Sequence, residues 1–149
     1  METFTTQEQI AGQLADYGFR FHHIGIIVRD LAVAAAAYRL LGFRPGHEEV
    51  VATQGVRVLL VPTREPDQYI ELFTPLSAGR LADFLTKRGE GMHHVAFAVD
   101  DIAAALGQLQ ANGVRLVDEM PRAGAHGWSV AFLHPASAHG VLIELVQEQ

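Results

Sequence analysis

Residues 21–31 read FHHIGIIVRDL, and residues 92–102 repeat this pattern as MHHVAFAVDDI. A second match lies at nearly the same spacing, because the tripeptide IEL occurs at residues 70–72 and again at residues 143–145. Self-similarity at a fixed spacing indicates a tandem duplication. Each copy brings one histidine and one glutamate to equivalent places, so two such pairs can meet around one metal ion.

Length and composition fit one soluble globular domain. The 149 residues are 49% hydrophobic and 19% charged, and a domain of this size buries about two thirds of its unfolded surface. A single copy of about 70 residues would have only a marginal core, so both modules are expected to share one domain. The sequence contains no cysteine. Any metal must therefore be held by nitrogen and oxygen ligands, which suit zinc, cobalt, nickel, manganese or iron.

The charge and the apolar runs argue against several classes of partner. A formal net charge of −6 without a basic run gives no attraction for nucleic acid or for an anionic membrane. The longest apolar runs are too short to cross a bilayer, and the first twenty residues lack the basic start and apolar stretch of a secretory signal. The sequence predicts a cytoplasmic protein with no nucleic-acid partner and no membrane partner.

The hydrophobic pattern predicts an α+β fold built from two βαβββ modules. Residues 1–20 are expected to form a helical N-terminal extension. Residues 21–149 are expected to form one domain, with module one at residues 21–76, a linking helix within residues 77–91 and module two at residues 92–149.

Each module reads as a strand, a helix and three further strands. The expected strands are residues 22–28, 48–53, 56–62 and 68–74 in module one, and 93–99, 115–120, 128–133 and 141–146 in module two. One helix covers one sheet face and leaves the other face free. Two such sheets paired side by side form a half-open barrel with a cleft between the modules.

Side chains alternate across a strand, so the pattern also assigns faces. In the first strand, the apolar residues at alternate positions share the face under the helix. His23 is therefore expected to face the cleft and His22 to face the helix. The same alternation in module two directs His94 into the cleft and His93 toward the helix.

The same reasoning directs Glu71 and Glu144 into the cleft, because apolar neighbours flank both on the opposite face. An ionised carboxylate in an otherwise apolar strand costs several kcal/mol unless it is paired or bound to a metal. His23, Glu71, His94 and Glu144 are thus predicted to ligate one divalent ion and to leave open positions for water or substrate. The alternative is that hydrogen bonds satisfy both histidines and that both glutamates pair with arginines.

Several motifs resemble the vicinal oxygen chelate superfamily, which includes glyoxalase and bleomycin resistance proteins. They are HIGI at residues 23–26, KRGEGMHHVAF at residues 87–97, EMPRAGAHG at residues 119–127, and FLHP at residues 132–135 followed by GVLIEL at residues 140–145. The last three together are similar to the methylmalonyl-CoA epimerase branch of that superfamily.

This resemblance implies interconversion of (2R)- and (2S)-methylmalonyl-CoA, an acyl-CoA thioester, by α-proton removal and return through a metal-stabilised enolate. It implies cobalt or zinc, with nickel or manganese as alternatives, and a homodimer. The family's metal ligands fall on His23, Glu71, His94 and Glu144, the four residues that strand alternation selects. Glu144 also matches one of the acid/base residues proposed for the family.

The chain departs from the family pattern at several positions. Val58 stands where some members carry a second acid/base glutamate, and many members have glutamine in place of Glu71. Ala136 replaces a lysine that is frequent in relatives, and Trp128 replaces smaller or polar residues. Positive charge for the CoA phosphates is available from basic residues that are equally well explained as surface charge: Lys87, Arg88, Arg115 and Arg122.

Three other functions are compatible with a fold of this kind. A glyoxalase I type lyase would use the same four residues on a glutathione hemithioacetal. A ring-cleaving dioxygenase would hold iron with two histidines and one carboxylate, so Glu71 counts against it. A non-enzymatic small-molecule-binding relative, such as an antibiotic-sequestering protein, would be expected to lack the ligand set.

Overall fold

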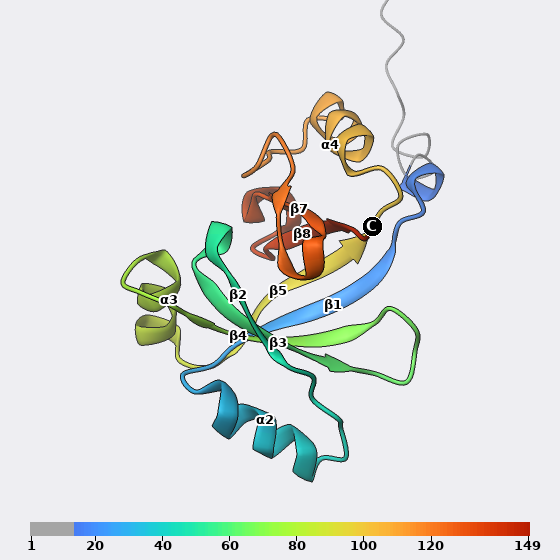
Figure 1. Ribbon diagram of the computed structural model, residues 1–149. Coiled ribbons are helices and arrows are strands. Elements are labelled where there is room, and N and C mark those ends of the chain that lie inside the picture. The colour runs from blue at the N-terminus through green and yellow to red at the C-terminus, as the bar shows by residue number, and fades with distance from the viewer. Residues whose placement is uncertain (1–13) are drawn as a thin grey trace, which may run out of the picture.

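The computed structural model describes residues 14–149 and contains one mixed, curled sheet of eight strands (Figure 1). The helix expected within residues 1–20 lies mostly outside the described residues; from residue 14 the chain forms a short 3-10 helix, η1 (Leu14–Tyr17). The sheet and its helices confirm the α+β fold with βαβββ modules. None of the helices in the described part is long and apolar enough to cross a membrane.

The elements follow one another in the expected order in both modules. Module one contains β1 (Arg20–Ile27), α2 (Leu31–Leu40), β2 (Glu48–Val51), β3 (Val56–Pro62) and β4 (Tyr69–Pro75), and α3 (Arg80–Arg88) follows it. Module two contains β5 (Gly91–Ala98), α4 (Ile102–Ala111), β6 (Arg122–Ala123), β7 (Ser129–Leu133) and β8 (Ile143–Gln147). Short 3-10 turns lie at η2 (Ala52–Gln54), η3 (Ala125–Gly127) and η4 (Pro135–Ala138).

The duplication is visible in the strand order, β2-β3-β4-β1-β5-β8-β7-β6. The first strands of the two modules, β1 and β5, pair antiparallel at the centre, and each pairs in parallel with the last strand of its own module. This arrangement brings the first and last strands of both modules together at the middle of the sheet. All four predicted site residues are on these four strands.

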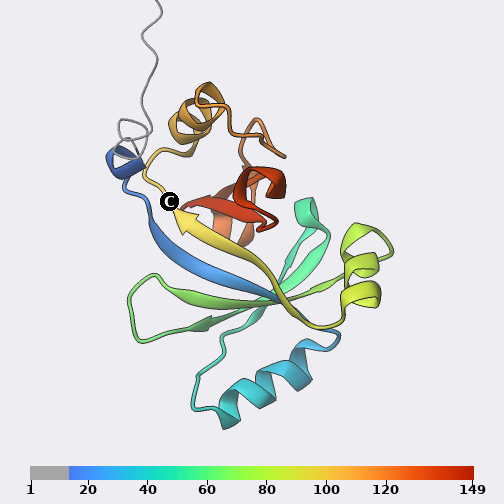
Figure 2. The same ribbon diagram turned by 180° about the vertical axis from the view of Figure 1, so that it is seen from behind.

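Equivalent helices cover the outer side of each half of the sheet, as the two opposite views show (Figure 1, Figure 2). Helix α2 begins at Asp30, whose carboxylate accepts a hydrogen bond from the backbone N–H of Val33 at 3.1 Å. Helix α4 begins in the same way, because Asp101 accepts from the N–H of Ala104 at 3.0 Å. Such caps satisfy backbone donors at a helix start. Each helix buries its apolar face against its own module, which leaves the inner face of the sheet for the site.

The strand expected at residues 115–120 is the main difference in secondary structure. There the chain makes only an isolated bridge between Leu116 and Leu133, and β6 is two residues long. The carboxylate of Asp118 accepts the backbone N–H of Phe132 at 2.9 Å. A side chain that takes a ladder hydrogen bond competes with regular strand pairing, so the edge of module two is irregular.

The prediction that His22 and His93 face the helices is wrong. Between β1 and β5, Phe21 pairs with Phe97 and His23 with Ala96, which leaves His22 as an extra residue. His93 is the extra residue at the equivalent place in β5. A β-bulge of this kind locally breaks the alternation of side chains.

Both outer histidines consequently lie beside the neighbouring cleft histidine. The Nδ1 atoms of His22 and His23 are 2.7 Å apart, and those of His93 and His94 are 2.9 Å apart. The two bulges place two histidines of each module, rather than one, against the site.

Candidate metal centre and its cavity

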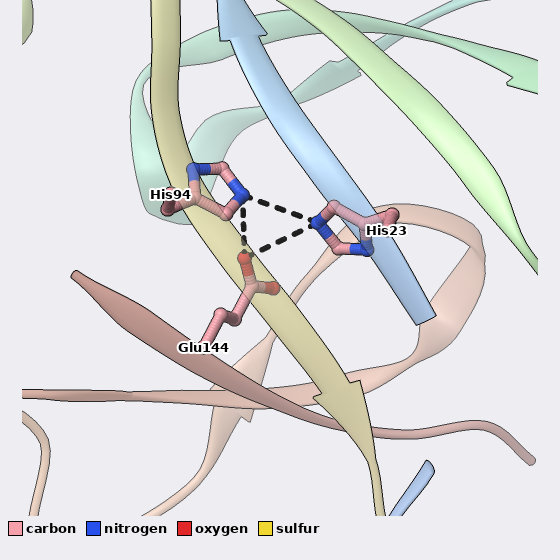
Figure 3. Close-up of side chains that lie close together, drawn as sticks. All are labelled: His23, His94 and Glu144. Atoms are coloured by element: carbon pink, nitrogen blue, oxygen red, sulfur yellow. Dashed lines mark hydrogen bonds and ion pairs between the residues drawn. The ribbon is translucent and has the colours of Figure 1, made fainter. Parts of the chain in front are cut away.

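Three buried side chains from three strands converge at the centre of the sheet. The Nε2 atoms of His23 and His94 are 3.1 Å apart. Glu144 Oε2 lies 3.0 Å from His94 Nε2 and 3.5 Å from His23 Nε2. Figure 3 shows the two imidazole rings and the carboxylate pointing toward one another. No more than 5% of any of the three residues is exposed.

Glu71, from β4, reaches the same two histidines over longer distances. Its Oε2 is 3.6 Å from His23 Nε2, and its Oε1 is 3.7 Å from His94 Nε2. The residue is buried. Glu71 therefore lies beside the compact group of His23, His94 and Glu144, and a different carboxylate oxygen faces each histidine.

The spacing of these donor atoms suits a metal ion. Ligand atoms about 2.1 Å from one ion lie about 3.0–3.4 Å apart in octahedral or tetrahedral arrangements. The distances among His23, His94 and Glu144 are 3.0, 3.1 and 3.5 Å, so two lie within this range and the third is close to it. Imidazole nitrogen and carboxylate oxygen are donors for zinc, cobalt, nickel and manganese, so the group can hold such an ion.

The two glutamates differ in their electrostatic environment. Burial raises the pKa of Glu71, and the nearby Glu144 raises it further, against the opposing effect of the histidines. Burial also acts to raise the pKa of Glu144, but hydrogen bonds with His23 and His94, together with their electrostatic attraction, outweigh burial and hold this pKa below its usual range. In the metal-free protein, Glu144 is thus the more readily ionised carboxylate.

One end of the site is closed by aromatic side chains. His22 is fully buried, and its ring lies 4.8 Å from that of Trp128 and 5.4 Å from that of Tyr69. Its Nε2 is 2.7 Å from Oε1 of Glu148, just beyond β8. Burial lowers the pKa of His22, although the hydrogen bond to Glu148 opposes this effect.

The other end opens into a cavity of about 430 Å³ beside His93. The cavity is lined by both carboxylates, by His93 and His94, and by apolar and basic side chains that include Val56, Phe132, Leu142, Arg80 and Arg122. In the alignment of the two modules, Val56 corresponds to Trp128 and Leu142 to Tyr69. Aliphatic side chains at these two positions of the open end, against aromatic ones at the closed end, thus make a duplicated cleft asymmetric.

The sequence pattern of the Glyoxalase/Bleomycin resistance protein/Dioxygenase superfamily matches residues 22–132. The ethylmalonyl-CoA/methylmalonyl-CoA epimerase of Cereibacter sphaeroides is 41% identical over 132 residues, 86% of this chain and 97% of that protein. The chain belongs to the methylmalonyl-CoA epimerase family of this superfamily.

Solved structures of that family have the same fold. The methylmalonyl-CoA epimerase of Mycobacterium tuberculosis superposes with a TM-score of 0.83 at 40% identity, covering 87% of this chain and 88% of that one. A methylmalonyl-CoA epimerase in complex with methylmalonyl-CoA and NH4+ gives a TM-score of 0.81 at 38% identity, covering 87% and 94% of the two chains. The fold expected from the duplicated sequence is confirmed.

The structure shows what surrounds two of the residues that depart from the epimerase pattern, Val58 and Trp128. Val58, at the position where some family members have a glutamate, is 1% exposed within an apolar cluster that includes Ile27, Phe73 and Ala125. No acid/base group is available there. Trp128 does not line the cavity, because it packs on His22 at the closed end.

Several cavity residues were not predicted as site residues. They include His93, which strand alternation directs to the helix face, and also His134 and Arg80. The only sequence signal for His93 is that the HH pair occurs in both modules at the same place. Arg122, one of the four basic residues considered for the CoA phosphates, also lines the cavity.

Proposed function

We propose that this protein interconverts (2R)- and (2S)-methylmalonyl-CoA. The observation that carries the proposal is the buried group of His23, His94 and Glu144, of which His94 and Glu144 line a cavity of about 430 Å³. It occurs in a chain that shares its fold and 38–41% of its sequence with proteins named as methylmalonyl-CoA epimerases.

The metal ligands in this proposal are His23, Glu71, His94 and Glu144, and the ion is divalent cobalt or zinc, with nickel or manganese as alternatives. A bound ion supplies Lewis-acid stabilisation for the negative charge that develops on the thioester oxygen. The two histidines supply neutral nitrogen donors, and the two carboxylates balance the charge of the ion. Glu71, which lies on β4 and faces both histidines, is the fourth ligand in this proposal.

Glu144 removes the α proton, because its carboxylate lines the cavity and is the more readily ionised of the pair. Epimerisation also needs a group that returns a proton to the opposite face of the carbon. Val58 supplies none. Glu71 is the other carboxylate that lines the cavity within residues 14–149 and comes from the opposite module, so we assign it the second proton transfer.

The cavity also suits the rest of an acyl-CoA thioester. Its apolar walls include Phe73, Phe132 and Leu142, and Arg80 and Arg122 lie on exposed parts of its lining. Apolar side chains accommodate the acyl methyl group, and the two arginines provide positive charge for a carboxylate or for phosphates on a protein of net charge −6.

The test is exchange of the α hydrogen of methylmalonyl-CoA with deuterated water, followed by mass spectrometry or NMR. Exchange is expected with zinc, cobalt, nickel or manganese, and it should stop when a chelator removes the metal. Absence of exchange with every one of these metals would contradict the epimerase proposal. Turnover of a methylglyoxal–glutathione hemithioacetal in place of exchange would identify a glyoxalase I type lyase.

A homodimer and a cytoplasmic location belong to the same proposal. Large apolar side chains are exposed at several places on the described surface, among them Leu40, Met92 and Met120, at 74–90% exposure. Apolar side chains that gather into one patch mark a contact surface, whereas single exposed ones are ordinary, so the dimer is tested by its mass. Sedimentation equilibrium should give twice the chain mass of 16.2 kDa, and cell fractionation should recover the protein with cytoplasmic markers.

A further inference from the structure

The contact between His22 and His23 restricts which nitrogen of each ring carries a proton. His23 directs Nε2 toward His94 and Glu144, while its Nδ1 lies 2.7 Å from Nδ1 of His22. A neutral imidazole binds a metal through its unprotonated nitrogen. With Nε2 of His23 free for a metal, the ring proton is on Nδ1, and this N–H donates to Nδ1 of His22.

Glu148 determines the tautomer of His22 in turn. Since Nδ1 of His22 accepts the hydrogen bond from His23, the ring proton of His22 is on Nε2. This atom lies 2.7 Å from Oε1 of Glu148. The carboxylate accepts this hydrogen bond. His22 is fully buried between Trp128 and Tyr69, so the ring cannot exchange the glutamate for water without breaking this packing. Glu148, His22 and His23 thus form a chain of hydrogen bonds with one direction.

His94, the other ligand histidine, has no such series of hydrogen bonds behind it. His94 makes the equivalent contact with His93, at 2.9 Å between Nδ1 atoms. The position that corresponds to Glu148 in module one is Pro75, which cannot accept from an imidazole through its side chain. Within residues 14–149, no carboxylate pairs with Nε2 of His93, and the residue lines the open cavity.

We propose that Glu148 and His22 are positioning residues that hold His23 in the tautomer and orientation needed for metal binding, on one side of the centre only. The proposal rests on the metal ligation proposed above. Hydrogen-bonded partners behind a ligand histidine fix its ring and raise its basicity, and their loss typically weakens metal binding about 10–100-fold.

The experiment measures the dissociation constant of zinc by competition with a chromogenic chelator, with no acyl-CoA present. Glu148→Ala is expected to weaken zinc binding about 10–100-fold. Glu148→Gln keeps an oxygen that can accept from Nε2 of His22, and it should recover most of this loss. The control is Glu65→Ala, which removes an exposed glutamate from the loop between β3 and β4. This variant should bind zinc like the parent protein.

A second variant separates positioning from general damage to the fold. His22→Phe retains an aromatic ring between Trp128 and Tyr69 but removes the acceptor for His23. If Glu148 acts on His23 through His22, the double variant His22→Phe/Glu148→Ala should lose no more zinc affinity than His22→Phe alone. The visible spectrum of the cobalt(II)-loaded protein should change in the same variants, because the geometry at His23 changes. Circular dichroism checks folding.

Unchanged zinc affinity in Glu148→Ala, or losses that multiply in the double variant, would overturn the proposal. So would a parent protein that binds no divalent metal. Since no substrate is used, a protein that binds zinc in the expected way but does not exchange the α hydrogen would contradict the epimerase function alone.

Discussion

The imidazole of His94 occupies the space that a side chain at Gly25 would need. The two residues are paired across β1 and β5, and a Cβ atom built on Gly25 would overlap the Cε1, Nδ1 and Nε2 atoms of the ring. Glycine in a strand often marks such a close approach. In module two the equivalent position is Ala96, opposite His23, so only one of the two cleft histidines requires a glycine beneath it.

Gly25→Ala is therefore expected to displace His94 from the centre. Zinc affinity should fall by more than the roughly 10–100-fold that loss of a supporting hydrogen bond costs, as measured by chelator competition. The control is Gly107→Ala in helix α4, where no atom other than the local helix backbone lies within 4 Å of the added carbon. That change should leave zinc binding intact and raise the free energy of unfolding by about 0.5–1 kcal/mol.

A comparison of His94→Ala with His93→Ala tests which histidine of the pair is a ligand. His94→Ala should abolish stoichiometric metal binding, because it removes the nitrogen 3.0 Å from Glu144 Oε2. His93→Ala should keep one metal per chain, since His93 lies against Nδ1 of His94 and not against the Nε2 atom that faces Glu144. Isothermal titration calorimetry gives both stoichiometries. A binding-competent His94→Ala protein would show that the ligand assignment in module two is wrong.

Strand alternation was sufficient to select the central residues from the sequence. His23, Glu71, His94 and Glu144 all face the cleft, because each lies in a strand with apolar residues on the opposite side and the duplication supplies an independent second copy. Strand alternation gave the wrong face for the residue that precedes each cleft histidine. His22 and His93 are the extra residues of two bulges, and a bulge carries no residue type that distinguishes it from a regular strand.

The closed and open ends could not be predicted for a related reason. Trp128, just before β7, and Tyr69, at the start of β4, come from different modules, and both rings contact His22 only in the folded, curled sheet. The partner of His22, Glu148, is 126 residues away in sequence. Nothing in the local pattern of any of these residues indicates the contact, so the asymmetry of the cleft emerges only with the tertiary structure.

Glu71→Gln tests the assignment of the second proton transfer. Glutamine keeps an oxygen that can face His23 or His94 but cannot carry the proton, so metal binding should persist within about tenfold. The exchange rate of the α hydrogen should fall about 10²–10⁴-fold, the usual contribution of a positioned acid or base. Mass spectrometry of the deuterated product measures it. An exchange rate equal to that of the parent would assign this step to water or to another group.

The stability of the metal-free protein should depend on pH through His93. Burial lowers the pKa of His93 from 6.5 to about 4. Between these values the unfolded chain binds the proton and the folded protein does not, so this contribution to stability is full above pH 6.5 and is lost as the pH falls toward 4. His93→Gln removes it. The difference in free energy of unfolding between the parent and His93→Gln should therefore change between pH 6.5 and 4 and level off below. A pH-independent difference in urea titrations would contradict this.

Exchanging one pair of equivalent residues tests which end of the cleft receives the substrate. Leu142 lines the open cavity, and its counterpart Tyr69 helps to close the other end beside His22. Leu142→Tyr should fill part of the cavity and raise KM for methylmalonyl-CoA at least about tenfold, the scale on which small changes of pocket shape act. Zinc affinity should remain unchanged, because Leu142 is not among the grouped donors.

The reciprocal Tyr69→Leu should leave KM unchanged and lower the melting temperature. If Tyr69→Leu raised KM instead, the substrate would enter from the end that the aromatic residues now close.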